Sequence, residues 1–271
     1  MISFTYAELS TFLASFIWPL SRILAFISSA PILSHRSIPT QVKIGFALLL
    51  TLIVVPTLQS LPSVDPGSEM GFLILMQQVV IGLAMGFAMR VIFVAIEMAG
   101  EIIGLQMGLG FALFFDPQNS GQVQLIGRFL GLIALLVFLA IDGHLQMIAI
   151  LAQSFSVLPI GIAGMPSLSF SVLANWGSEI FLLGMKLSLP ILTTLLIANL
   201  ALGILTRAAP QLNIFAVGFP LTLAIGLAMM SLVLPYYLPI LEHMFQNGLR
   251  IMLDIITPTT SELPRTEEYQ R

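Results

Sequence analysis

Residues 70–96 read MGFLILMQQVVIGLAMGFAMRVIFVAI, and this stretch is apolar throughout except at Gln77, Gln78 and Arg90. A bilayer core is spanned by about 20 apolar residues in a helix. The strands of a membrane barrel alternate polar and apolar residues, and this stretch does not. It therefore predicts a membrane-spanning helix and an all-α fold.

Five further apolar runs reach or approach the same length on either side of this stretch. They are Phe12–Leu33, Ile44–Leu61, Leu125–Ile141, Phe170–Leu205 and Ile214–Leu241. The stretches Ile102–Phe115 and Gly143–Gly164 are also apolar, but Gly or Pro interrupts them, and length alone does not decide whether they cross. The pattern predicts a polytopic, membrane-associated helical protein.

The composition excludes several classes of protein. Of 271 residues, 58% are hydrophobic and only 8% are charged, against about 25% charged in soluble domains. The Lys and Arg residues are scattered singly along the chain, so they form no basic stripe that could follow a nucleic-acid backbone. Cysteine is absent, the histidines are isolated in sequence, and no familiar catalytic motif is present. We therefore expect no enzyme, no cofactor, no metal site and no nucleic-acid partner.

Charged residues interrupt the apolar runs. Arg22 and Lys186 either reach toward a helix end and water or lie buried, and the sequence leaves both alternatives open. Glu97 and Glu101 are four residues apart, so they share a helix face and repel one another. Such a face requires water or the cations of another subunit, and we expect Glu97 and Glu101 to contact other subunits.

Two local patterns predict how the helices begin and pack. Asp65 followed by Pro66 is typical of a helix N-cap with proline at the first helical position, and Glu69 suits the first turn. Glycines four residues apart allow close helix packing. They occur at Gly82–Gly86, at Gly100, Gly104 and Gly108, and at Gly127–Gly131. Prolines within the runs predict bent helices.

The segment GLQMGLGFALFFDP, residues 104–117, contains three glycines, which favour a flexible backbone, and large apolar residues that would share one helix face. Met107, Phe111, Phe114 and Phe115 recur at helical steps, and the ordinary interpretation is a stripe of core residues. The glycines favour a second interpretation, an apolar plug that seals a pore by excluding water. Its predicted hinge residues are Gly104, Gly108, Gly110, Asp116 and Pro117.

Five motifs together resemble the FliR family, the flagellar export-gate proteins of type III secretion, over nearly the whole chain. They are WPLSR at residues 18–22, APIL at 30–33 followed by Ile38–Pro39, GEIIGLQMG at 100–108 with Asp116–Pro117, DGHL at 142–145 and RAAPQLNIFAVGFPL at 207–221. The last run is the most specific. We expect Arg207, Gln211 and Asn213 within it to contact other subunits.

The resemblance implies a fold of kinked helical hairpins. It implies a FliP-like region over residues 1–180, with the plug loop at 106–122, a FliQ-like helical hairpin over 181–257, and a polar tail at 258–271. It also implies a complex with FliP and FliQ, with FlhB and FlhA as neighbours, in the bacterial inner membrane at the flagellar basal body. The cargo would be unfolded flagellar subunits.

The function implied is closure of the export gate by an apolar plug. The alternative is a secondary transporter for a small solute, in which broken helices and charges at mid-membrane form the binding site. That alternative predicts two halves of similar hydropathy, and the two halves of this chain look dissimilar.

Overall fold

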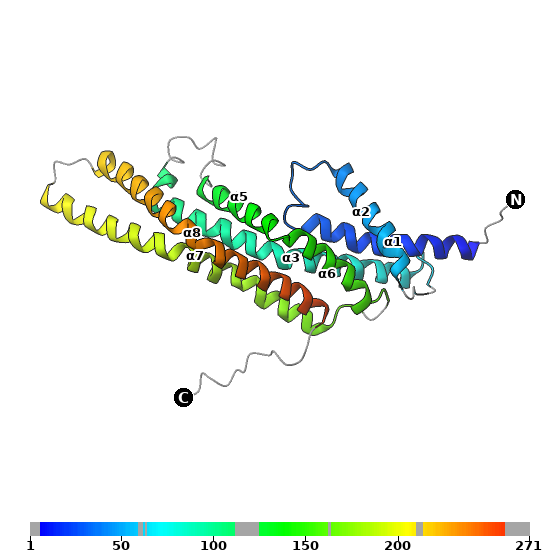
Figure 1. Ribbon diagram of the computed structural model, residues 1–271. Helices are drawn as coiled ribbons and strands as arrows, with labels where there is room; N and C mark the ends of the chain where they lie inside the picture. Colours follow the sequence, from blue (N-terminus) through cyan, green and yellow to red (C-terminus); the bar gives the residue numbers. More distant parts are fainter. Residues whose placement is uncertain are drawn as a thin grey trace, which may run out of the picture. The chain divides into compact units, whose positions relative to one another are not determined.

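The computed structural model describes residues 6–58, 62, 64–111, 125–161, 164–209 and 214–257, and within them it contains helices and no strand (Figure 1). The predicted all-α fold is confirmed. The α-helices are α1 Tyr6–Ser29, α2 Thr40–Val54, α3 Glu69–Gln106, α5 Leu125–Ala140, α6 Gly143–Val157, α7 Ser167–Ala208 and α8 Ile214–Ile256. Two short 3₁₀ helices, η1 Val55–Thr57 and η2 Leu109–Phe111, follow α2 and α3.

Four of the described helical segments are long and apolar enough to cross a membrane: Thr40–Thr57, Glu69–Gln106, Ser167–Ala208 and Val217–Ile256. Helices α5 and α6 meet the same criteria only as a pair, and they are bent by 67° at a short break. Asp142 lies in this break with a φ of 55°. The greater part of each of the six predicted runs lies on a described helix, and Gly143–Gly164 contributes α6.

The start of α3 differs in detail from the prediction. Asp65 is not the N-cap, because its carboxylate accepts a hydrogen bond from the backbone N–H of Gly67 (2.9 Å) in a turn that precedes the helix. Ser68 takes the capping role, since its hydroxyl accepts the N–H of Gly71 (3.1 Å). Glu69 lies in the first turn as expected. Ser68, immediately before Glu69, therefore caps α3 in place of Asp65.

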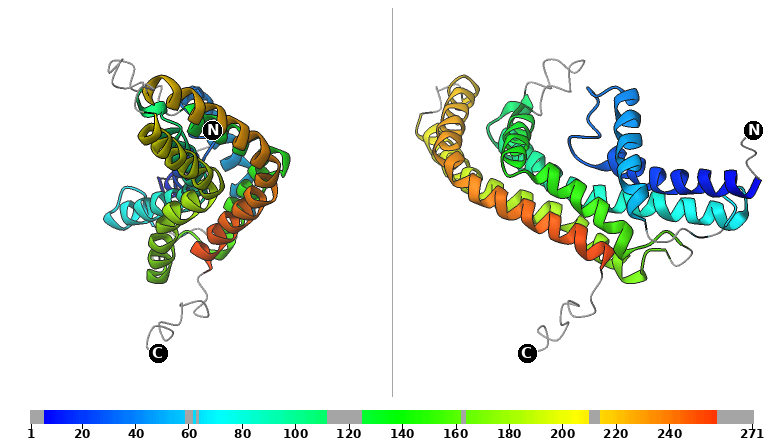
Figure 2. Two further views of the ribbon diagram at one scale, coloured as in Figure 1. Left: turned by 90° about the vertical axis from the view of Figure 1, so that its left-hand side faces the viewer. Right: turned by 45° about the vertical axis from the view of Figure 1, so that its right-hand side comes forward.

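The chain divides into two compact units, each of which has its own core. The first unit contains Met1–Met89, Gln146–Asn175 and Leu249–Arg271. In it, α1 and the first half of α3 lie alongside each other (Figure 2). A Cβ atom on Gly82 would overlap the carbonyl of Arg22, and one on Gly86 would overlap the Ser29 side chain. The predicted glycine pair on α3 therefore provides the close approach to α1.

The second unit contains Arg90–Leu145 and Trp176–Gly248. Its core holds three aromatic rings from three helices: Phe93 on α3, Phe138 on α5 and Phe245 on α8. Their centroids lie 4.9–5.6 Å apart, in edge-on and tilted arrangements, which suit aromatic pairs. Helices α7 and α8 run side by side in this unit (Figures 1 and 2). The rings therefore join α8 to the α3–α5 pair.

Prolines lie inside three helices, as predicted: Pro19 in α1, Pro190 in α7, and Pro220, Pro235 and Pro239 in α8. A proline inside a helix lacks the N–H that would bond to the carbonyl four residues earlier, which for Pro190 is the carbonyl of Lys186. In the turn before Pro190, the hydroxyl of Tyr237 donates a hydrogen bond to the carbonyl of Leu187 (2.6 Å). This bond joins α8 to α7 one residue after that carbonyl.

Candidate functional site

The segment predicted to form the plug begins where α3 ends. Gly108 has a φ of 86°, a conformation that side chains disfavour, and α3 ends two residues before it. A Cβ atom on Gly104 would lie 3.6 Å from Cγ1 of Ile126, and Gly110 lies in η2. The backbone of Phe111 is described, but its side chain lies outside the described part of the structure, as do Phe114, Phe115, Asp116 and Pro117. The plug and its hinge therefore stay predictions.

Met107 is the one predicted plug residue whose side chain is described. It is 1% exposed and lies against α8, where a Cβ atom on Gly226 would come within 2.5 Å of Met107 Cγ. The hydroxyl of Thr222 donates a hydrogen bond to the Met107 carbonyl (3.0 Å). The start of the segment is therefore attached to α8.

The glycines predicted to allow close helix packing lie where α3 contacts α5, a contact called here the α3–α5 seam. A Cβ atom on Gly100 would lie 2.5 Å from Cα of Gly127, so the two backbones touch there. A Cβ atom on Gly127 would lie 3.4 Å from Cγ of Glu101, and one on Gly131 would lie 3.4 Å from Cγ of Glu97. The side chains of Glu97 and Glu101 therefore lie against the face of α5 that carries these glycines.

The charges at this seam are not paired within the described residues. Glu97 is exposed and Glu101 is half-buried, and the structure places no ion pair on either carboxylate among the side chains it describes. Arg90 and Arg128 are near enough to attract Glu97 electrostatically. Both carboxylates thus remain open to groups outside this chain.

Arg22 in the first unit is fully buried, with an exposed fraction of 0%. Its Nε donates to Oε1 of Gln78 (2.8 Å), and Nη1 donates to the carbonyl and hydroxyl of Ser154 (2.9 and 3.0 Å). Nη2 donates to the carbonyl of Leu158 (2.9 Å), and the guanidinium lies 4.3 Å from the centroid of the Phe155 ring. Snorkelling, one of the two alternatives for Arg22, is therefore wrong.

The acceptors of Arg22 explain how the cation is tolerated. The carbonyls of Ser154, in the last turn of α6, and of Leu158, the residue that follows α6, lie at the negative end of the helix dipole. The Ser154 carbonyl also accepts the N–H of Leu158 (2.9 Å), so Arg22 is its second donor. The face of the Phe155 ring attracts the cation as well. The residues that hold Arg22 lie up to 136 positions away in sequence, so local patterns gave no signal for them.

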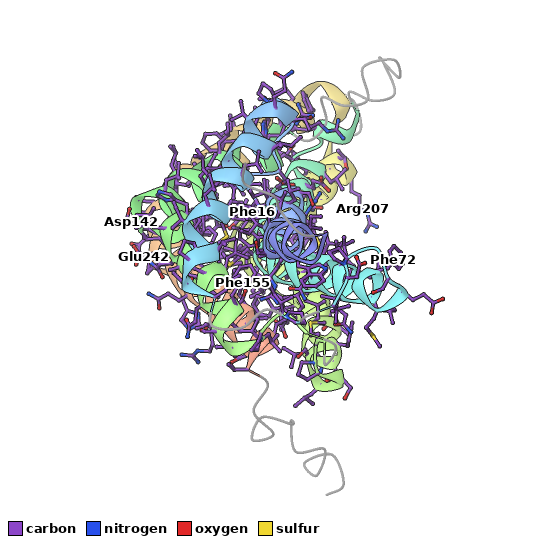
Figure 3. The ribbon with its side chains drawn as sticks, turned by 90° about the vertical axis from the view of Figure 1, so that its right-hand side faces the viewer. Phe16, Phe72, Asp142, Phe155, Arg207 and Glu242 are labelled. Carbon is purple, nitrogen blue, oxygen red and sulfur yellow. The ribbon has the colours of Figure 1, made fainter. Side chains whose placement is uncertain are left out.

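Arg207 lies in the last turn of α7, where a cation suits the helix dipole. Its side chain is exposed and points away from the helices (Figure 3). Gln211 and Asn213 lie outside the described residues. Within the part of the chain that the structure describes, no three His, Asp or Glu residues gather to hold a metal ion.

Comparison with known proteins assigns the family. The family model described as bacterial export proteins, family 1, matches residues 13–248. The chain belongs to this family. It is 46% identical to the flagellar biosynthetic protein FliR of Pectobacterium carotovorum over 261 residues, which are 96% of this chain and 100% of that protein. It is 45% identical to FliR of Escherichia coli K12, covering 97% and 99% of the two chains.

Distant FliR proteins match over nearly the same range. FliR of Aquifex aeolicus is 33% identical over 89% of this chain and 93% of its own length. The resemblance to the FliR family seen in the sequence motifs is thus confirmed. These relatives give the transporter alternative no support.

Proposed function

We propose that this FliR-family chain is a subunit of the flagellar protein export gate in the bacterial inner membrane, at the flagellar basal body. It assembles with FliP and FliQ, beside FlhB and FlhA, and lets unfolded flagellar subunits pass. The observation that carries the proposal is the end-to-end match to proteins named flagellar biosynthetic protein FliR. Its role is structural and gating rather than catalytic, so energy comes from partners.

The outer faces of the helices support membership of a larger assembly. Only 28% of the most apolar stretch of α7 and 22% of that of α8 are buried within the chain. Lipid covers apolar faces, but α7 also carries exposed Lys186 on such a face, and a charge facing lipid is costly. Helices of neighbouring subunits, together with lipid, cover both the apolar helix faces and the exposed Lys186.

Within the gate, the apolar residues of the plug segment close the conduit. Phe111, Phe114 and Phe115 follow the glycines at 104, 108 and 110 in the sequence, and glycine allows a wider range of backbone conformations than other residues. Rings of this kind exclude water and ions, yet a passing chain can displace them. The hinge consists of those glycines with Asp116 and Pro117.

The proposed division of the chain into two regions follows the two partner proteins, FliP and FliQ, that these regions resemble. The proposal keeps residues 1–180 as the FliP-like region, with the plug loop at 106–122, and 181–257 as the FliQ-like hairpin. Helices α7 and α8 supply a hairpin of the required kind, although α7 is continuous through residue 180. The tail at 258–271 lies outside the described residues.

The charged residues of the α3–α5 seam are proposed contacts to other subunits, as are Arg207, Gln211 and Asn213. Glu97 and Glu101 carry this part of the proposal, because no ion pair within the described structure satisfies them. Cations on FliP-like neighbours would do so. Replacing both carboxylates removes that attraction while keeping the shape of the side chains.

The double substitution Glu97→Gln/Glu101→Gln is therefore expected to weaken assembly. A tagged variant should bring down less FliP and FliQ than the wild-type chain at low salt, and the difference should shrink as the salt concentration rises, because salt screens the attraction that only the wild-type carboxylates make. The matched control is Glu69→Gln, which removes an exposed carboxylate from the first turn of the same helix. Full recovery of partners by the double variant would show that water, not another subunit, satisfies this face.

A further inference from the structure

A stripe of exposed residues runs along one face of α7 in the second unit. The residues follow one another at alternating steps of four and three, which keeps them on one face of a helix. They are Lys186, Pro190, Thr193, Ile197, Leu200, Ile204 and Arg207. The buried residues Ile191, Leu195 and Leu202 lie on the opposite face. The stripe is therefore the face of α7 that points away from the core of this unit.

The stripe has a cation at each end. Lys186 and Arg207 are 21 residues apart, which corresponds to about 31 Å along a helix. The hydrocarbon core of a bilayer is about 30 Å thick. Ile197, Leu200 and Ile204 lie between the two cations and are 63–68% exposed. A helix of another subunit would not require cations one bilayer thickness apart, so the spacing favours lipid as the occupant of this face.

The hydroxyl groups between the two cations are satisfied within the helices. Thr193, Thr194 and Thr206 on α7 donate to backbone carbonyls one turn earlier (2.7–3.0 Å). Ser231 on α8 does the same (2.7 Å). Hydrocarbon offers no partner to a polar group, so internal bonds of this kind are required there. Asn199 lies on the flank of α7 and not in the stripe.

Helix α8 places a tyrosine at the level of Lys186. The hydrogen bond from Tyr237 to the carbonyl of Leu187 (2.6 Å) fixes the level at which the two antiparallel helices face each other. Tyr236 is the neighbouring residue on α8, and it is 73% exposed. Tyrosine is enriched where a bilayer meets water, because its ring is apolar and its hydroxyl is polar. Lys186 and Tyr236 therefore mark one border on both helices.

Charged and polar residues gather beyond this border. On the far side of Lys186 and Tyr236, the second unit carries Trp176, Ser178 and Glu179 on α7, and Glu242, His243, Gln246 and Asn247 on α8. Residues 187–206 and 214–241 contain no Asp, Glu, Lys, Arg or His. The polarity of both helices therefore changes close to the same level.

The lengths of the two helices agree with a border inside them. Helices α7 and α8 have 42 and 43 residues, which makes each of them about 63–65 Å long. A straight helix of this length fits within about 30 Å of hydrocarbon only at a tilt of about 60°, and membrane helices tilt by about 0–40°. Only part of each helix can therefore lie in the hydrocarbon.

We propose that lipid hydrocarbon covers the stripe of α7 between Lys186 and Arg207, together with the facing residues 217–236 of α8. Lys186 and Tyr236 meet the phosphate groups of lipid at one border, and Arg207 meets them at the other. The inference rests on the proposed function for the presence of a membrane. It assigns the stripe to lipid, and it places the parts of both helices beyond Lys186 and Tyr236 outside the hydrocarbon.

Nitroxide labels test the proposal, because the chain contains no cysteine. The single variants Thr193→Cys, Ile197→Cys, Leu200→Cys and Ile204→Cys carry a label on the stripe, and Gln246→Cys carries one beyond the border. Each gate is assembled with its partners and reconstituted in vesicles of phosphatidylethanolamine and phosphatidylglycerol. Relaxation of the label by oxygen, which concentrates in hydrocarbon, is compared with relaxation by a water-soluble nickel chelate. The unsubstituted gate gives the background.

The expected result is a depth profile along the stripe. Oxygen should dominate at all four positions, and its excess over nickel should be largest at Ile197, which lies midway between the two cations. The label at Gln246→Cys should show no oxygen excess. Labels on the stripe that neither reagent reaches would show that another subunit covers it, and labels that nickel reaches would show water. A largest oxygen excess at Gln246→Cys would place the membrane elsewhere on the helices. Each of these three outcomes overturns the proposal.

A tryptophan variant covers the case in which labelled gates do not assemble. Lipids brominated at the middle of their acyl chains should quench the added fluorescence of Ile197→Trp strongly, and that of the matched control Gln246→Trp much less. The natural Trp18 is buried and Trp176 lies beyond the border, so the wild-type chain gives a weakly quenched baseline. Equal quenching of Ile197→Trp and Gln246→Trp contradicts the proposal.

Recovery of FliP and FliQ with each tagged variant separates this inference from the proposed function. If the partners are recovered and neither reagent reaches the stripe, the lipid assignment is wrong and the gate stands. If oxygen dominates on the stripe of a chain that recovers no partner even as wild type, the gate is wrong and the lipid assignment stands.

Discussion

Replacing Arg22 with Met is expected to destabilise the first unit strongly. Met has a similar length but donates no hydrogen bond, so the Gln78 side chain and the Ser154 and Leu158 carbonyls lose the donors seen at 2.8–2.9 Å. Buried hydrogen bonds to a charged group contribute about 1.5–3 kcal/mol each, and a buried acceptor without a partner costs a similar amount. Because contributions within one hydrogen-bond network do not add, we expect a total loss of about 3–5 kcal/mol, which is a large share of the stability of a domain.

The measurement is the melting temperature of the detergent-purified protein with its partners, together with its level in the membrane. We expect a fall of about 10 °C or more and loss of motility. Arg22→Lys should be nearly as harmful, because an ammonium group cannot reproduce the planar array of donors. Arg250→Met removes an exposed arginine from the same unit and should change little. Normal stability of Arg22→Met would mean that the buried guanidinium network does not hold this unit.

Replacing Phe111, Phe114 and Phe115 with Ala is expected to make the gate leak. Burial of three phenylalanine side chains contributes up to about 5–9 kcal/mol, and about 5.5 kcal/mol moves a two-state equilibrium from 1:99 to 99:1. Loss of the rings can therefore convert a closed gate into one that is open most of the time. Cells that express the complete gate should take up small solutes and lose membrane potential.

The matched control removes the same number of rings from exposed positions. Phe72, Phe170 and Phe181 are 52–70% exposed on the described helices, and their replacement by Ala should leave the membrane tight. Unchanged permeability of the plug variant, in a gate that assembles normally, would count against the plug.

The sequence predicts the helices well because their signals are local. The run at residues 70–96 needs only its own length and hydropathy to specify a helix, and α3 contains all of it. The glycine spacings likewise predicted close helix packing, and Gly82, Gly100 and Gly127 do lie at helix contacts. The sequence did not show which glycines meet, since Gly100 and Gly127 come from different helices.

Tertiary contacts could not be predicted in the same way. Burial of Arg22 depends on the end of α6, more than 130 residues later in the chain. The position of Met107 depends on Thr222, 115 residues away, and neither Thr222 nor Gly226 has a feature that distinguishes it from other small residues of a membrane helix. At Asp65 the failure was local, because a turn and a helix cap use the same side-chain chemistry.

The central claim is that this chain works as one subunit of a heteromeric membrane gate. The most direct measurement is the mass of the intact particle that a tagged copy brings out of the membrane in mild detergent. The account predicts a particle far heavier than one chain of 29.4 kDa, which releases FliP and FliQ on dissociation. A stable particle that contains only this chain, alone or in several copies, would contradict it.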